Sequence, residues 1–116
     1  MQNVFIKNIK HEEVISLADQ VDIMSGQVVS KTLAQNSAVS ITLFAFDKGE
    51  EISTHDSAGD AMVTVLEGTG RFTVDGVEYL LKPNETLIMP AKKPHAVYAQ
   101  ENFKMMLVVV FPQNKE

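Results

Sequence analysis

The chain has no cysteine among its 116 residues, which excludes disulfide bonds and metal sites built from thiolates. It also has no apolar run long enough to cross a bilayer, so no membrane association is predicted. The first residues contain no basic segment followed by an apolar stretch, and no signal peptide is expected. These absences together predict a cytoplasmic protein.

Clusters of Lys and Arg are missing too, and the net charge is −5. Binding to the phosphate backbone requires local positive charge, so nucleic acid is not an expected partner. Helical periodicity is scarce: only residues 12–20 could form one or two turns, with Val14 and Leu17 facing inward. No helix pair that could enter DNA is present, which excludes a complete transcription factor.

Two-residue alternation is the dominant pattern of the chain, and it predicts strands. In residues 38–46 one face is wholly apolar, whereas the other carries Ser40, Thr42, Phe44 and Phe46. Asp75-Gly76 between two alternating segments predicts a two-residue type I′ hairpin, because both residues tolerate positive φ. The expected strands cover residues 27–34, 38–46, 61–67, 71–74, 77–80, 86–89, 95–99 and 103–111, with residues 90–94 as a loop.

About eight short strands in a chain of this length predict one all-β domain over residues 1–116, an antiparallel sandwich or barrel. The last strand is apolar on both faces over residues 105–110 and is expected to be buried on both sides. The alternation by itself does not choose among jelly-roll, immunoglobulin-like and lipocalin-like arrangements.

Two histidines, 40 positions apart, lie in short punctuated stretches. Gly49 is followed after five residues by His55, and Gly68 closes the first stretch. In the second stretch, Pro90 precedes His95. These stretches, about residues 49–68 and 84–99, resemble the two sequence motifs of the cupin superfamily. The resemblance implies an antiparallel double-sheet jelly-roll barrel, here with a short N-terminal helical turn.

The resemblance also implies a site inside the barrel, where metal-binding cupins converge two histidines and a Glu of the first motif with a His of the second. Here the second His position is Ser57 and the Glu position is Ala61, so His55 and His95 remain of the four. Two imidazoles hold Zn, Ni, Mn, Fe or Cu weakly unless a third ligand joins them. Asp60, beside the Glu position, is the expected substitute, with Asp56 and Ser57 as weaker candidates. Period-two alternation argues against Asp60 unless the strand begins irregularly after Gly59.

Two functions from different classes follow, and the sequence leaves both open. The first is binding of a small organic ligand in a barrel interior lined by Ala61 and Val63, with His55 and His95 as its polar groups. The second is a metal-dependent enzyme of the dioxygenase, isomerase or decarboxylase type acting on a small metabolite. The sequence names neither the ligand nor a catalytic residue.

A homodimer is the expected assembly. Val4-Phe5-Ile6 is predicted to form an apolar strand with no partner in a local hairpin. An unpaired strand edge invites pairing with a second chain.

Overall fold

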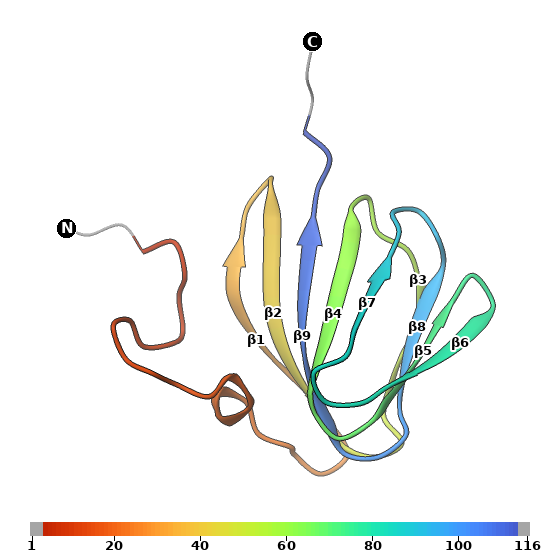
Figure 1. Ribbon diagram of the computed structural model, residues 1–116, viewed down its shortest axis with the longest axis horizontal. Coiled ribbons are helices and arrows are strands. Elements are labelled where there is room, and N and C mark those ends of the chain that lie inside the picture. Colours follow the sequence, from red (N-terminus) through yellow and green to blue (C-terminus); the bar gives the residue numbers. More distant parts are fainter. Residues whose placement is uncertain (1–3, 114–116) are drawn as a thin grey trace.

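The computed structural model describes residues 4–113 and is an all-β fold, with one short helical turn (Figure 1). The elements are η1(Leu17–Gln20), β1(Val28–Gln35), β2(Val39–Phe46), β3(Glu51–His55), β4(Asp60–Glu67), β5(Gly70–Val74), β6(Val77–Leu81), β7(Thr86–Met89), β8(His95–Ala99) and β9(Phe103–Val110).

The strands form two facing sheets, a five-stranded sheet in the order β1-β2-β9-β4-β7 and a four-stranded sheet in the order β3-β8-β5-β6. Neighbouring strands run antiparallel in every pair. β9, the last in sequence, lies at the centre of the larger sheet between β2 and β4. This arrangement confirms the expected double-sheet jelly roll.

The β5–β6 hairpin forms as its turn residues dictate. Asp75 has φ 50° and Gly76 has φ 84°, and the strands pair from Val74 and Val77 outward. Two consecutive positive φ angles are the mark of a type I′ turn, whose twist matches that of the flanking strands. This prediction from the sequence is confirmed.

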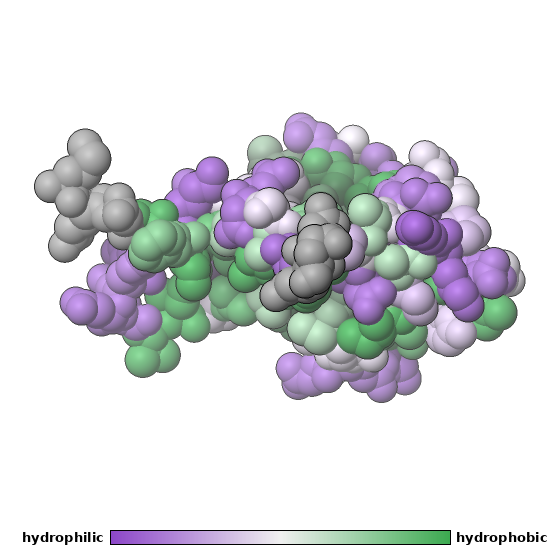
Figure 2. Space-filling model, turned by 90° about the horizontal axis from the view of Figure 1, so that it is seen from above, coloured by the Kyte–Doolittle hydropathy of each residue, from purple (hydrophilic) through white to green (hydrophobic). Residues whose placement is uncertain are grey.

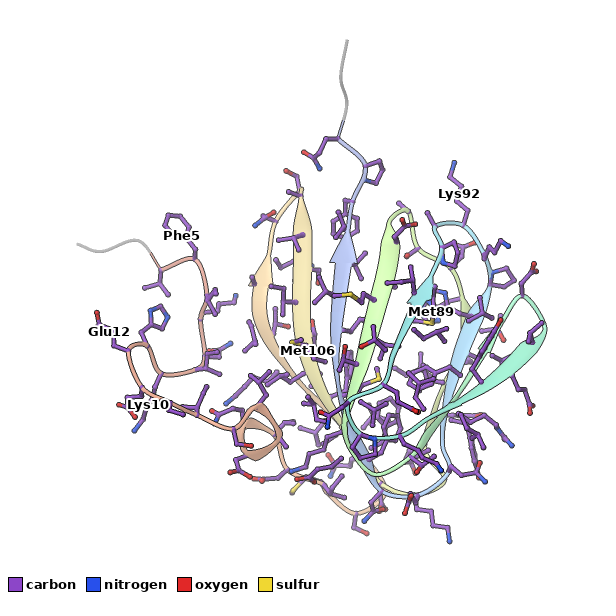
Figure 3. The ribbon with its side chains drawn as sticks, viewed as in Figure 1. Phe5, Lys10, Glu12, Met89, Lys92 and Met106 are labelled. Carbon is purple, nitrogen blue, oxygen red and sulfur yellow. The ribbon has the colours of Figure 1, made fainter. Side chains whose placement is uncertain are left out.

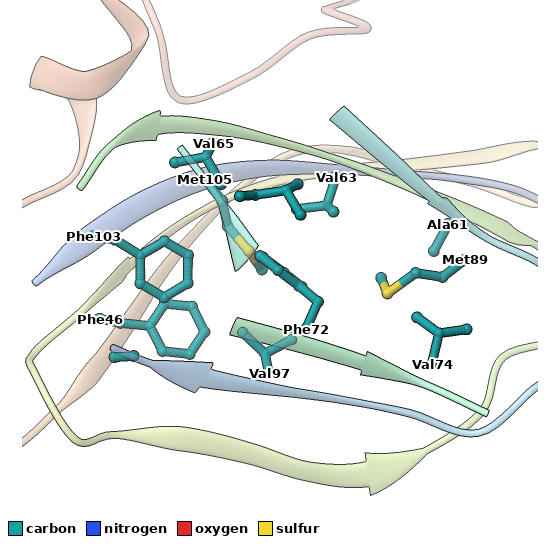
Figure 4. Packing of buried hydrophobic residues seen from close by; sticks show 12 residues of the cluster. Phe46, Ala61, Val63, Val65, Phe72, Val74, Met89, Val97, Phe103 and Met105 are labelled. Carbon is teal, nitrogen blue, oxygen red and sulfur yellow. The ribbon is translucent and has the colours of Figure 1, made fainter. Parts of the chain in front are cut away.

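The main core fills the space between the sheets (Figure 4). Phe103 is its centre: its ring stacks on Phe46 at 4.6 Å between centroids and meets Phe72 edge to face at 6.0 Å. All three rings are fully buried. Buried aromatic side chains contribute much of the stability of a small domain, because each removes a large apolar surface from water.

A second apolar cluster lies on the outer face of the larger sheet, where the N-terminal segment covers it. Val21 and Leu17 pack there against Leu43 of β2 and Met106 of β9. Lys104, only 8% exposed, holds the N-terminal segment against the sheet, because its Nζ donates a hydrogen bond to the carbonyl of Ala18 at 2.7 Å. β9 is therefore buried on both faces from Phe103 to Met105. Residues 106–109 are half-buried and Val110 is exposed, so the burial expected over residues 105–110 is present only in part.

The N-terminal predictions fail in two respects. Val4, Phe5 and Ile6 do not form a strand, and Phe5 is 82% exposed and points away from the sheets (Figure 3). The one or two helical turns expected within residues 12–20 are present as the single turn η1, but Val14 is fully exposed instead of inward-facing. Glu12 has φ 61°, a left-handed conformation in which a right-handed helix cannot continue.

β3 is the strand that the sequence analysis missed. It is short, and Ile52 is its only apolar residue, so it shows no alternation of apolar and polar residues. Four of its five residues are exposed. Its identity as a strand depends on its pairing with β8. That pairing also decides where His55 points.

Candidate functional site

His55 and His95 lie directly opposite each other on β3 and β8. Ile52 pairs with Val97, so regular pairing would bring Thr54, rather than His55, opposite His95. The register shifts between Ile52 and His55 because β3 carries one extra residue there. Such a bulge reverses the face on which the following side chain lies. It places His55 on the inner face, beside His95.

The two imidazole rings are in contact, with centroids 4.4 Å apart and planes at 70°. His95 is 4% exposed, whereas His55, on the edge strand, is open to solvent. On its other side His95 pairs with the buried Val74 of β5. The histidine pair therefore extends from the apolar interior, at His95, to the solvent at the β3 edge, at His55.

Backbone carbonyls fix the rings of both histidines. Nδ1 of His55 lies 2.9 Å from the carbonyl oxygen of Ser53, and Nδ1 of His95 lies 3.2 Å from that of Lys93. A carbonyl only accepts hydrogen bonds, so each Nδ1 carries the proton and each neutral ring keeps its lone pair on Nε2. Neither Nε2 has a hydrogen-bond partner among residues 4–113. Two nitrogen lone pairs are thus available to a ligand or a metal ion.

Burial lowers the pKa of His95 below its ordinary value of 6.5, because the imidazolium loses hydration, and the positive charge of His55 lowers it further. The carbonyl of Lys93 and the carboxylate of Asp56 act in the opposite direction on this pKa. His95 is accordingly neutral at pH 7. A neutral imidazole can accept a hydrogen bond or bind a metal, and an imidazolium can do neither.

Ala61 and Val63, the expected lining residues, lie on the inner face of β4 and are buried at 2% and 0% exposure. Ala61 pairs with Met89 of β7 on one side and with Val109 of β9 on the other. In the close-up of the core, Met89 and Ala61 lie at the same end as Val74, the neighbour of His95 (Figure 4). They form the closed apolar side of the interior near the histidine pair.

Asp60, the expected third ligand, is exposed, and its Oδ1 accepts a hydrogen bond from the backbone N–H of Ala91 at 2.8 Å. Pairing across Asp60 and Ala61 is regular, so the irregular strand start that would turn Asp60 inward is not present. Residues 4–113 contain no group of three His, Asp or Glu side chains that could hold a metal. The structure joins His55 to His95 and leaves Asp60 outside the pair.

The weaker candidates do not complete a ligand set either. Asp56 is exposed, and the hydroxyl of Ser57 donates to the carbonyl of Gly59 at 2.6 Å. The donor set therefore fits a weak site of two imidazole nitrogens, with the remaining positions left to water or ligand.

Similarity to known proteins agrees with this architecture. The model of the cupin domain family matches residues 42–111, which include both histidines and most of both sheets. The chain belongs to the cupin superfamily. No curated protein matches it.

Solved structures similar to this cupin cover nearly its whole length. A conserved protein of unknown function from Streptococcus pyogenes is 46% identical, with a TM-score of 0.94 over 97% of this chain and 98% of that one. A cupin superfamily protein from Desulfitobacterium hafniense is 34% identical, with a TM-score of 0.88 over 92% and 98%. A cupin 2 conserved barrel domain protein from Leptotrichia buccalis is 43% identical, with a TM-score of 0.81. The match covers 83% of this chain and 47% of the Leptotrichia chain.

The part of this cupin that the structure describes holds no helix of the length and apolar character that crossing a bilayer requires.

Proposed function

We propose that this cupin binds a small organic ligand inside the barrel through His55 and His95. The observation that carries the proposal is the contact between the two rings at 4.4 Å, with both Nδ1 atoms engaged by carbonyls and both Nε2 atoms free. A carboxylate only accepts hydrogen bonds, so the exposed His55 would bind it in the doubly protonated form, donating from Nε2. The neutral His95 would accept a hydrogen bond from the same ligand.

A metal-dependent enzyme is the second candidate, and one observation favours it. Metal-binding histidines commonly donate their second ring N–H to a carbonyl or carboxylate, and both histidines here have such a carbonyl. Zn, Ni, Mn, Fe or Cu would bind the two Nε2 atoms and supply Lewis-acid or redox chemistry. Residues 4–113 supply no third protein ligand beside the two histidines, which supports the first proposal over this one.

Titration with hexanoate, followed by NMR of the histidine ring protons, tests the binding proposal. We expect the signals of His55 and His95 to shift together. His11 provides an internal control, because it lies outside the site, with its Nε2 2.7 Å from the carbonyl oxygen of Ile6. His55→Ala should weaken hexanoate binding and His11→Ala should not, while hexanoate offers His95 no hydrogen-bond donor. Equal shifts of all three histidines, or none, would contradict the proposal.

Metal analysis of untagged protein separates the two candidates. One equivalent of tightly held metal, removed only by a chelator, would favour the enzyme. Substoichiometric metal lost on dialysis, with hexanoate binding retained, would favour the binding protein. The cytoplasmic location expected from the sequence remains a prediction.

We also propose that the cupin is a homodimer, although its basis differs from the unpaired strand first expected. Val4, Phe5 and Ile6 are 58%, 82% and 45% exposed, on a segment that projects from the body of the molecule (Figure 2). Neighbouring apolar side chains with this exposure are typical of a surface that a partner covers.

A further inference from the structure

The inner face of β1 and β2 carries hydroxyl groups where the rest of the interior is apolar. Phe44 and Phe46 of β2 pack into the core between the sheets, and β2 pairs regularly with β9 along its length. Alternation along the strand therefore directs Thr42 and Ser40 toward the same interior. Thr32 of β1 pairs with Thr42 and shares that face.

These hydroxyls have no hydrogen-bond partner among residues 4–113. Thr32, Ser40 and Thr42 make no side-chain hydrogen bond in the described part of the chain, and no buried polar side-chain atom there is left unpaired. Their hydroxyls are therefore open to solvent or to a ligand. Thr64 and Thr86 on the outer face of the same sheet differ, because their hydroxyls bond each other at 2.7 Å.

The inner face of the larger sheet is buried at β4 and increasingly exposed toward β1, the open side. Inner-facing Ala61 and Val63 of β4 are buried, Leu107 of β9 and Thr42 of β2 are half-buried, and Ser30 of β1 is exposed. At the closed end β6 and β7 lie side by side and line common surface hollows.

In the four-stranded sheet, β3 is the edge opposite β6. β3 therefore lies on the open side, facing β2 and β1. His55 is exposed on that edge, while its neighbour His95 is buried. Ser40 lies in the same row of paired residues as Val109 and Ala61. Ala61 is at the end of the interior near the histidine pair, so Ser40 is at that end too. The open side is thus bounded by imidazoles on one sheet and hydroxyls on the other.

We infer that the ligand of this cupin is a polyhydroxylated carboxylate, and that Thr42 and Ser40 select it by hydrogen bonds to its hydroxyls. This inference rests on the proposed binding at His55 and His95, which would hold the carboxylate. A hydroxyl side chain both donates and accepts, so it complements an alcohol of the ligand in either role. An alkyl chain in the same place would remove Thr42 and Ser40 from water without replacing their hydrogen bonds, which is unfavourable.

Gluconate and hexanoate test the inference, because both are six-carbon carboxylates and differ in their hydroxyls. We expect calorimetry to show tighter binding of gluconate to the wild type. The double variant Ser40→Ala/Thr42→Val removes two hydroxyls and should weaken gluconate binding about thirtyfold, which corresponds to two ordinary hydrogen bonds. Hexanoate binding should be unchanged or stronger.

Three further variants control the measurement. Thr42→Ser keeps the hydroxyl and should retain gluconate binding. Thr86→Val removes a hydroxyl from the outer face of the same sheet and should have no effect on either ligand. His55→Ala should weaken both ligands equally. Unfolding temperature confirms that each variant is folded, and the comparison of gluconate with hexanoate on the wild type keeps the test decisive if the double variant is not.

The two proposals fail differently. Hexanoate binding equal to or tighter than gluconate binding, with both shifting the histidine signals, would overturn the inference and leave the histidine site intact. Equal loss of gluconate binding in Thr86→Val and in the double variant would also overturn it. If neither carboxylate shifts the signals of His55 and His95, both proposals are wrong.

Discussion

His95 lies against His55 in the barrel interior, at 4.4 Å between ring centroids, and is the more buried of the two. Burial first, and then the positive charge of His55, lower the pKa of His95. Two consequences can be measured, one for titration and one for stability.

The NMR titration of His95 should report a pKa below 6.5, and His55→Asn should raise it, since the variant removes a neighbouring positive charge. His11→Asn should leave it unchanged. A pKa of His95 that is insensitive to His55→Asn would show that burial alone sets it.

Stability should fall on acidification. Below pH 6.5 the unfolded chain binds a proton at position 95 while the folded chain still resists it, so protons favour unfolding. The contribution is present above pH 6.5 and is lost as pH falls toward the lower folded pKa. Urea unfolding between pH 7.5 and 5 should show a steeper loss in the wild type than in His95→Gln. Identical slopes would contradict this assignment.

Restoring the missing cupin ligands should restore metal affinity. In Ser57→His/Ala61→Glu the carboxylate enters a site that is 2% exposed, so the variant should be less stable than wild type without metal. Added Ni, Mn or Zn should stabilise it, by about 2.7 kcal/mol at one hundred times Kd. The wild type should show a smaller shift in unfolding temperature.

Asp60→Asn is the matched control for this prediction. Its carboxylate faces the backbone N–H of Ala91, so the variant should leave the metal response of the wild type unchanged. A metal-dependent shift in the wild type as large as in the double variant, and lost in Asp60→Asn, would show that Asp60 joins the histidines when metal binds.

Replacing Gly68 by alanine is expected to destabilise the fold more than replacing Gly76. Gly68 has φ 72°, and a Cβ there would collide with the carbonyl oxygen of Asn102 and with Phe103. Gly76 has φ 84° but open space around it. Gly76→Ala should cost about 1 kcal/mol for the left-handed conformation alone, and Gly68→Ala more than about 3 kcal/mol in urea unfolding. Equal losses of unfolding free energy in the two variants would mean that the backbone near Asn102 moves aside at little energetic cost.

Light scattering at micromolar concentration should give the mass of a dimer. Phe5→Asp introduces a charge at the most exposed of Val4, Phe5 and Ile6 and should shift the mass toward a monomer. Leu80→Asp is the control, because Leu80 is also exposed, at 56%, but lies on β6 of the smaller sheet. A monomeric wild type would refute the homodimer.

Local signals were sufficient for much of the fold. The Asp75-Gly76 hairpin was predictable because its backbone angles depend on those two residues. Alternation located β2 and β4 because the side chain of each successive strand residue points to the opposite face. The sequence also showed that one face of β2 mixes Ser40 and Thr42 with two phenylalanines. It did not show that this face lies between the sheets.

The sequence by itself determined every described strand except β3, together with the hairpin and two histidines at cupin motif positions. Only the tertiary structure decided that these histidines meet. His55 faces inward because β3 carries an extra residue against β8, and a bulge depends on pairing between segments 40 residues apart. Asp60 stays outside because β4 pairs regularly with β9 at that point. Such registers are set by long-range packing, which no local pattern of residues encodes.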